Sequence, residues 1–365
     1  MSAALDTVCV QLGTGGGSRG DLWRWVFLAG LSCVLMGAFF LNLALGSVRI
    51  PLSEIATILT GGEASKPSWN YIVLAFRLPK ALTAILAGAA LAVSGLQMQT
   101  LFRNPLADPY ILGINAGASL GVALVVLATG AATGFLSNVG LLGDLSLIVS
   151  AIAGASLVTG LVIVAARWLR HAMTLLILGL MLGYATSAVV SILIYFSVPE
   201  QIQAYITWTF GSFGGVTGRQ LMILAPVIGA GLLLAGLLTK PLNALLLGES
   251  YARSMGANVR RVRFWLIAGT SVLAGAVTAF CGPIAFLGVA IPHLCRSLLR
   301  TSDHRVLMPA TMLMGGLVAL LADLVASVPG SRTILPLNAV TALLGAPIVV
   351  WIVLHRDGPR SNFAS

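Results

Sequence analysis

Long apolar stretches separated by short polar segments fill most of this chain. A helix needs about 20 apolar residues to cross the hydrocarbon core of a bilayer, and ten stretches come near this length. We therefore predict an all-α polytopic membrane protein with about ten transmembrane helices. The predicted spans are residues 23–46, 79–101, 106–130, 145–167, 174–197, 220–239, 264–281, 284–299, 306–327 and 335–354. A further short helix is expected within 199–218, on the outer surface.

The two ends of the chain are polar and divide it into three parts. We predict an N-terminal tail at residues 1–22, a ten-helix transmembrane domain at 23–354 and a C-terminal tail at 355–365. With the N-terminus inside, 15 of the 21 Lys and Arg residues fall on the cytoplasmic side. This bias follows the positive-inside rule, so both tails are predicted to be cytoplasmic.

Composition agrees with the membrane class. The chain is 58% hydrophobic and 9% charged, whereas soluble domains carry roughly 25% charged residues. The net charge of +10 would suggest nucleic acid as the partner of a soluble chain. No basic stretch has the interleaved aromatic residues of a single-strand binder, so we attribute the charge to the cytoplasmic loops.

A sequence repeat predicts two related halves. The pattern AGAxxAxxG at residues 87–95 recurs at 274–282, and the same offset pairs Pro105 with Pro292. An odd number of predicted crossings separates the two copies, so the halves run in opposite directions. Inverted repeats of this kind are typical of transporters.

A polar, basic segment at residues 248–263 interrupts the apolar pattern, and the charge distribution places it in the cytoplasm. The chain has no phosphate-binding P-loop, because none of its lysines (Lys66, Lys80 and Lys240) follows a glycine as the G-K-[ST] motif requires. We therefore expect the segment to contact a partner that supplies energy.

Polar segments also flank the second predicted span. Arg77 and Lys80 lie at its outer start, where they could be membrane anchors or a docking patch for an acidic partner that Arg332 joins. At its inner end, Pro105 and Pro109 cannot both lie in one regular helix. That turn is compatible with a constriction at the inner mouth.

Two isolated polar residues leave other functions open. Asp323 lies in an apolar run, where an ionisable residue is a functional candidate, or else near the outer end of its helix, where water would solvate it. An ion-coupled secondary transporter would need such residues. Ser119 lies in a G-x-S-x-G pattern, which suggests an intramembrane hydrolase, but its apolar surroundings favour packing of small residues.

Several motifs in the same order resemble the permease subunits of bacterial ABC importers for iron-siderophore, haem and vitamin B12. The motifs are Arg77–Lys80, Ala87–Gly95, Arg103–Gly113, Leu247–Gly256, Gly282–Arg296 and Leu343–Pro347. The resemblance implies a permease in the bacterial inner membrane that works by alternating access. It also implies a homodimer with two cytoplasmic ATPase subunits and a periplasmic binding protein.

By this resemblance the chain is a transport subunit without an ATPase site, a catalytic residue, a metal or a cofactor of its own, because ATP and Mg bind to the partner ATPases. The implied site residues fall into three groups. The ATPase-coupling residues are Gly248, Glu249, Ala252, Arg253 and Gly256. The cytoplasmic gate consists of Asn104, Leu106, His171 and Thr174. The residues that dock the binding protein are Arg77 and Lys80, together with Arg332, which replaces a basic residue that the family has near Ser327.

The resemblance does not decide the cargo. An iron chelate, either a siderophore complex or haem, is expected because it is frequent in the family, and cobalamin is the alternative. The fifth and tenth spans are expected to line the path at the dimer axis.

Overall fold

The structure, a computed structural model, describes residues 17–127, 144–166, 168–169, 172–327 and 334–354. All regular secondary structure in these residues is helical. Ten helices of 13 residues or more form the bulk of the described fold: α2 (Gly17–Ala44), α5 (Leu78–Phe102), α6 (Ile114–Val126), α8 (Asp144–Ala166), α9 (Ala172–Tyr195), α11 (Gly218–Leu237), α14 (Val259–Cys281), α15 (Leu287–Leu299), α16 (His304–Ala326) and α17 (Leu337–Leu354).

The prediction of about ten membrane-crossing helices is confirmed for the described residues. Seven helical stretches have the length and composition of a membrane span, and α6, α15 and most of α17 are shorter apolar helices. The remaining elements are short: α3 (Leu52–Leu59), α4 (Pro67–Tyr71), η1 (Ile72–Arg77), η2 (Pro109–Leu112), α10 (Pro199–Thr209), α12 (Thr239–Leu246) and α13 (Glu249–Ser254). Helix α10 is the short helix expected within 199–218.

The predicted span at 106–130 is wrong at its start. Helix α6 begins only at Ile114, and the preceding chain is irregular apart from the single 3-10 turn η2. Two features prevent an earlier start: Pro109 opens η2, and Gly113 has a positive φ of 77°. The predicted span joined this segment to the helix because both contain apolar residues, but Asp108 and Pro109 lie in the segment, whereas α6 contains no charged residue and no proline.

The described helices form two sets in the same order. In the first set α5 is followed by an irregular segment, the 13-residue helix α6, and then α8 and α9; in the second, α14 is followed by an irregular segment, the 13-residue helix α15, and then α16 and α17. This order supports the predicted repeat. The pairing of Pro105 with Pro292 does not hold, because Pro105 lies in the turn before η2 and Pro292 lies inside α15.

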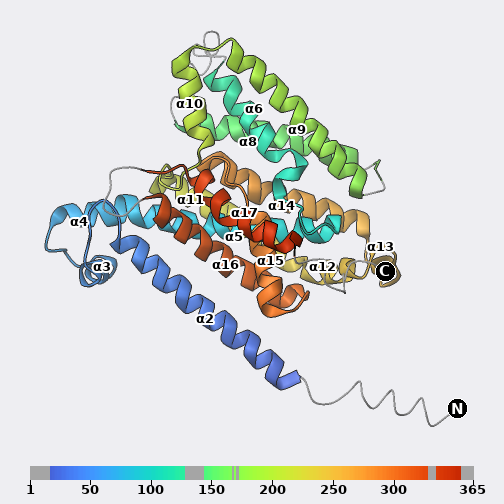
Figure 1. Cartoon of the computed structure of the whole chain (residues 1–365), viewed down its shortest axis with the longest axis horizontal. Coiled ribbons are helices and arrows are strands. Elements are labelled where there is room, and N and C mark those ends of the chain that lie inside the picture. Colours follow the sequence, from blue (N-terminus) through green and yellow to red (C-terminus); the bar gives the residue numbers. More distant parts are fainter. Residues whose placement is uncertain (1–16, 128–143, 167, 170–171, 328–333, 355–365) are drawn as a thin grey trace.

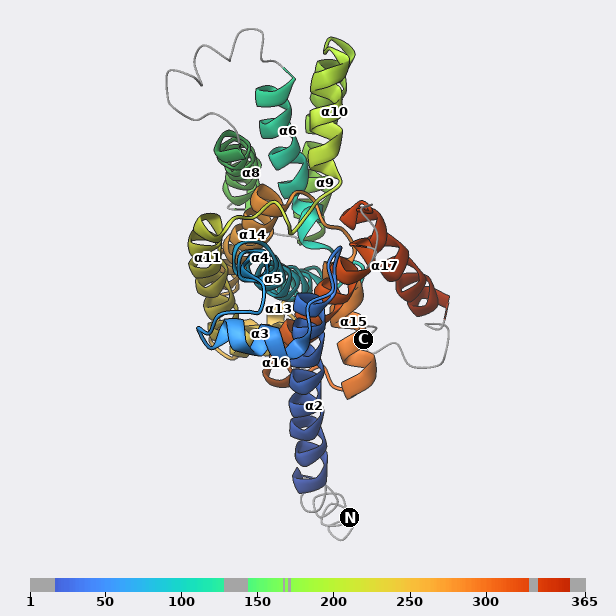
Figure 2. The ribbon, with the colours of Figure 1, turned by 90° about the vertical axis from the view of Figure 1, so that its left-hand side faces the viewer.

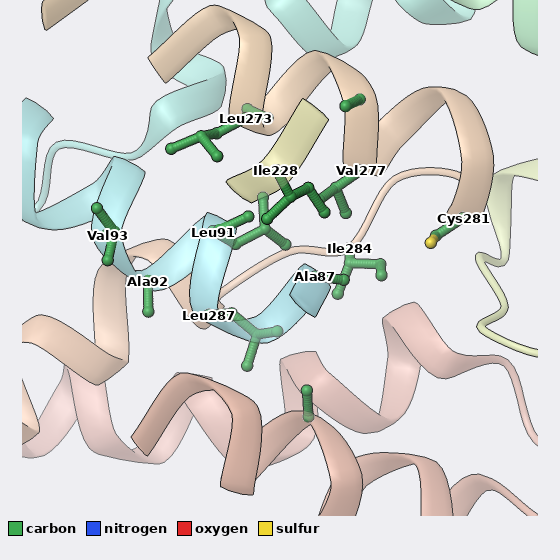
Figure 3. Close-up of a cluster of buried hydrophobic side chains, with 14 of the residues drawn as sticks. Ala87, Leu91, Ala92, Val93, Ile228, Leu273, Val277, Cys281, Ile284 and Leu287 are labelled. Atoms are coloured by element: carbon green, nitrogen blue, oxygen red, sulfur yellow. The ribbon is translucent and has the colours of Figure 1, made fainter. Parts of the chain in front are cut away.

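Helix α5 runs through the centre of the bundle, between α11, α14, α15 and α16 (Figure 2). Its residues Leu91 and Val93 belong to the core that Leu273 and Val277 of α14 also enter (Figure 3). Glycines let the backbones meet: a Cβ on Gly95 would lie 1.8 Å from the carbonyl oxygen of Gly288 in α15. Close contact through glycine is typical of helices packed in membranes.

The two ends of the bundle carry different short helices. Helices α12 and α13 lie at the end where α2 begins, and α3 and α4 lie at the opposite end (Figure 1). We call these the inner and the outer end, according to the predicted orientation. Helices α6, α8, α9 and α10 gather on one side of the bundle, and α2 lies on the other (Figures 1 and 2).

Candidate functional site

Two short helices, α12 and α13, lie together at the inner end, and we call this pair (residues 239–254) the coupling segment after its predicted role. Gly248 separates them with φ 118° and ψ 154°, a conformation that only glycine adopts readily. Ala252 of α13 is fully buried, and Gly256 lies just beyond the segment with a positive φ of 84°. Asn258 then caps α14 by accepting a hydrogen bond from the Arg261 amide at 3.0 Å. All five predicted coupling residues therefore lie in one compact helix-turn unit.

An ion pair fastens α13 to α14. The Glu249 carboxylate lies 2.7 Å from the Arg263 guanidinium, whose side chain is only 8% exposed. The same carboxylate lies 3.6 Å from Arg253, but that arginine is 67% exposed, and water screens such a pair. Arg263 also donates to the carbonyl of Leu169, which follows α8, at 3.3 Å. This buried arginine thus joins the coupling segment to the inner connection between α8 and α9.

A second arginine joins the coupling segment to α5. Arg103 ends α5 in the left-handed region with φ 48°, and its guanidinium donates to the carbonyl of Leu245 in α12 at 3.4 Å. The guanidinium also lies against Gly248, where a Cβ would come within 2.8 Å of Nη2. Asn104 is the next residue in the chain, so the predicted gate begins directly beside this contact.

The predicted gate residues are only partly described. Asn104 accepts a hydrogen bond from the Leu106 amide at 3.0 Å, which fixes the turn, and the Leu106 side chain is 41% exposed. Thr174 is exposed on α9, a helix that contacts both α5 and η2. His171 lies outside the described residues.

The inner end holds a further polar site that the sequence patterns did not indicate. Asp303 caps α16, accepting from the Arg305 amide at 2.9 Å and from the Asn243 amide of α12 at 2.6 Å. Partial burial acts to raise the pKa of Asp303, but these hydrogen bonds and the nearby charges outweigh it and lower the pKa below its ordinary value. The carboxylate is therefore the stable form at neutral pH.

At the outer end, Arg77 is committed to the protein itself. It is 9% exposed, and its guanidinium donates to the carbonyls of Leu43 at 2.6 Å and Ala44 at 3.1 Å, and to that of Val48. These carbonyls lie at and just beyond the C-terminal end of α2, where a helix leaves such groups unpaired. A docking role for Arg77 stays a prediction, and its described contacts are structural.

Lys80 forms an ion pair with Asp323. The two charged groups are 3.0 Å apart, and Asp323 also accepts from the Asn42 amide at 3.0 Å. Asp323 is 4% exposed and lies three residues from the end of α16. Of the two alternatives for Asp323, the place near the outer end is correct, but water does not solvate the carboxylate there, since it is buried and paired with Lys80.

Lys80 also donates to the Ser327 hydroxyl at 2.7 Å. The structure thus brings together Lys80 and the position where the family carries a third basic residue, in a cavity of about 530 Å³ that Arg77 and Asp323 also line. With its side chain 27% exposed, Lys80 is the more accessible of the two predicted docking cations. Arg332 lies outside the described residues.

Ser119 has no hydrolase geometry. It lies within helix α6, not on the strand-to-helix turn that a nucleophile elbow requires. The glycines beside it pack helices together: a Cβ on Gly117 would lie 2.5 Å from the Gly154 carbonyl oxygen, and one on Gly121 would lie 1.9 Å from that of Ser150. The packing interpretation of the motif is therefore the correct one.

Comparison with known proteins accounts for this arrangement. Residues 34–355 match the model of the FecCD transport family. The chain belongs to the FecCD transport family. Among its relatives, the vitamin B12 import system permease protein BtuC of Klebsiella pneumoniae is 38% identical over 338 residues, which cover 92% of this chain and 95% of the relative. BtuC of an Escherichia coli strain is 38% identical over 333 residues, covering 91% and 95%.

Solved structures agree with the fold. One described as an inward-facing conformation of a metal-chelate type ABC transporter has a TM-score of 0.78 and 28% identity, covering 90% of this chain and 98% of the other. A second, PsaBC from Streptococcus pneumoniae in complex with Fab, has a TM-score of 0.52 at 18% identity, covering 84% and 96%, and shows the fold alone. The chain is thus a multi-pass permease of a bacterial ABC importer, as the motifs predicted.

The family motifs indicated residues 248–256 as the predicted coupling site but not the residues that attach the coupling segment to the bundle. Arg263, Arg103 and Asn243 each join it to a different part of the bundle. Only the density of arginines around Arg263 hinted at such a role in the sequence. A single buried arginine among exposed ones cannot be identified from pattern, because burial depends on which helices meet.

Proposed function

We propose that this FecCD-family permease carries a cobalamin across the inner membrane. Relatives named as vitamin B12 permeases are 38% identical over more than nine tenths of the chain, and this observation carries the proposal. The iron chelate expected from family frequency is not confirmed and becomes the second candidate. Its support is the similarity to a metal-chelate type transporter at 28% identity.

We propose that the working unit contains two copies of this chain, two cytoplasmic ATPase subunits and a periplasmic binding protein. ATP and Mg bind to the ATPases, and this chain contributes the path. Helix α9 supports a dimer axis because it leaves many large apolar side chains exposed, Ile177, Met181, Tyr184 and Ile192 among them. A second copy and lipid are the surroundings that such a surface fits.

The proposed coupling runs from α12 and α13 into the bundle by two contacts. When the ATPases move this helix pair, Arg263 transmits the movement to the connection between α8 and α9, and Arg103 transmits it to the turn at Asn104 and Leu106. The ATPases thereby shift the balance between inward- and outward-open states. A partner can do this only by binding one state more tightly than the other.

The test is uptake by the reconstituted complex. The chain is purified with its ATPase and binding protein, placed in liposomes, and supplied with radiolabelled cyanocobalamin, or with haemin or a ferric siderophore in separate arms. We expect ATP-dependent accumulation of cyanocobalamin that the iron chelates do not reduce. Accumulation of an iron chelate alone would overturn the cargo, and accumulation by the chain without ATPase would overturn the ATP-driven mechanism.

Docking of the binding protein is tested by a pair of variants. Lys80→Gln removes the more accessible of the two described docking cations and should weaken the binding protein's affinity by about ten-fold, within the range for a charged group in an interface. Arg49→Gln is the matched control, because Arg49 is an exposed cation near the same end outside the cavity. Equal effects of the two variants would remove Lys80 from the docking site.

A further inference from the structure

Besides the contact of Asn243 with Asp303, helix α12 joins the bundle through a buried histidine. His304, the first residue of α16, is 1% exposed. Its Nδ1 lies 2.8 Å from the Asn243 side-chain oxygen of α12, and its Nε2 lies 2.9 Å from the Thr100 hydroxyl of α5. The ring therefore bridges the coupling segment and the central helix from a third element.

The surrounding hydrogen bonds fix how this bridge is built. Asn243 donates its amide to Asp303 at 2.6 Å, so its oxygen faces His304, whose backbone amide also donates to it at 2.9 Å. Nδ1 must then carry the hydrogen that binds Asn243. In the neutral ring Nε2 is an acceptor, and the Thr100 hydroxyl donates to it.

The Thr100 hydroxyl has a competing acceptor. It also lies 2.9 Å from the carbonyl of Leu96 in its own helix, and one hydroxyl hydrogen cannot serve both acceptors well. Thr100 can therefore hold His304 or return to its own helix. This is a contact that can break without leaving an unpaired donor, which suits a junction between parts that move.

We propose that His304 is a positioning residue, which links α12 through Asn243 to Thr100 and so to the gate turn four residues further on. The inference rests on the proposed coupling role of α12 and α13. It adds a route separate from Arg103 and Arg263, because it acts on the side of α5 that faces α16. Gln99, the residue before Thr100, accepts a hydrogen bond from Arg296 at 2.5 Å and donates one to the Val289 carbonyl of α15 at 3.2 Å. This part of α5 is therefore held by α15 through Gln99 and by α16 through Thr100.

The experiment measures movement of the gate without requiring the cargo. Leu106→Cys serves as the reporter, with Cys9 and Cys33 replaced by serine, in the reconstituted complex with its ATPase. Labelling by a membrane-impermeant maleimide from the inner side is compared with and without ATP. The rate of ATP hydrolysis is recorded in parallel.

Thr100→Val removes the hydroxyl at almost unchanged volume. We expect the ATP-dependent change in labelling to fall about five-fold, as for the loss of one hydrogen bond, while ATP hydrolysis continues. Thr100→Ser keeps the hydroxyl and should restore the response. The matched control is Thr83→Val in the same helix, because Thr83 is equally buried but, among the described residues, its hydroxyl binds only the Pro79 carbonyl of its own helix.

Asn243→Ala tests the other end of the relay. If His304 joins the two, the double variant with Thr100→Val should respond no worse than either single variant, since coupled residues are not additive. Additive loss, or a normal ATP response in Thr100→Val, overturns the relay and leaves the proposed function intact. No ATP response in the unaltered reporter complex overturns the proposed function and the relay with it.

Discussion

The Arg263 contact allows a quantitative test of how the coupling segment is held. Replacing Arg263 by glutamine removes a charge-assisted hydrogen bond to Glu249, worth roughly 1.5–3 kcal/mol, and a donor to Leu169, worth about 1 kcal/mol. Glu249 is 35% exposed and can be rehydrated, which offsets part of the loss. We expect α13 to be less stably attached by about 2–3 kcal/mol.

Arg253→Gln is the matched control, because it removes the other arginine beside the same carboxylate. Arg253 is 67% exposed and 3.6 Å away, so its loss should cost no more than about 0.5 kcal/mol. Buried Arg263 cannot bind an ATPase directly, so any effect of its replacement must pass through the position of α13 or of the connection between α8 and α9.

Hydrogen exchange of residues 249–257 is the assay. A destabilisation of about 2–3 kcal/mol should speed exchange by roughly thirty- to one-hundred-and-fifty-fold in Arg263→Gln, with little change in Arg253→Gln. ATP hydrolysis should persist in the Arg263 variant while uptake per ATP falls. Similar exchange in the two variants would refute the claim that burial distinguishes these ion pairs.

Three further predictions follow from the backbone and the caps. Gly95→Ala should destabilise the protein by about 3 kcal/mol or more, because the Cβ would lie 1.8 Å from a carbonyl oxygen. The control is Gly37→Ala, which has open space around it and should leave the melting temperature unchanged. Equal losses of stability in the two variants would contradict the packing argument. Gly248→Ala should reduce uptake per ATP, since it strains a glycine-only backbone and displaces Arg103; unchanged coupling would count against that contact. The pKa of Asp303 is lowered in the folded protein, so the ionised carboxylate stabilises the fold at pH values above the unfolded pKa of about 3.9. This stabilisation is lost as the pH falls through the lower folded pKa. Asp303→Asn should therefore flatten the dependence of melting temperature on pH in this acidic range, and an unaltered dependence would show that the cap does not contribute.

The sequence predicted the fold well because its main signals are local. Hydrophobic length identified the ten crossings, and the excess of positive residues supplies their predicted orientation. The predicted start of α6 is too early, because the predicted span runs through Leu106, Ile111 and Leu112 although Asp108 and Pro109 lie between them. The sequence signal for the later helix start was the pair Pro109 and Gly113, two residues that are typical of turns.

The candidate site was predicted only where it is contiguous. Residues 248–256 form a single motif and were recognised together, whereas Arg263, Asn243 and His304 contribute through contacts between distant elements. Asn243 and His304 are 61 residues apart in sequence yet share a hydrogen bond. Arg77 shows the same limit from the other side: its sequence position gives no sign of burial, and the three carbonyls that bind it lie at and just beyond the end of another helix, α2. Its docking role stays a prediction.

The distribution of glycine contacts indicates where the bundle can move. Close backbone approaches hold α5 against α15 and α16, and separate approaches hold α6 against α8. Backbones in such contact do not slide by small amounts, so movement is expected between the two groups and not within either. Arg263 lies on α14, which contacts both α5 and α8, and its bond to Leu169 crosses between the groups. Force on α13 would then act at their boundary. Spin-label distances should change with ATP between α5 and α8 but remain constant between α5 and α16; a change of similar size within the second pair would show that the glycine contacts yield during transport.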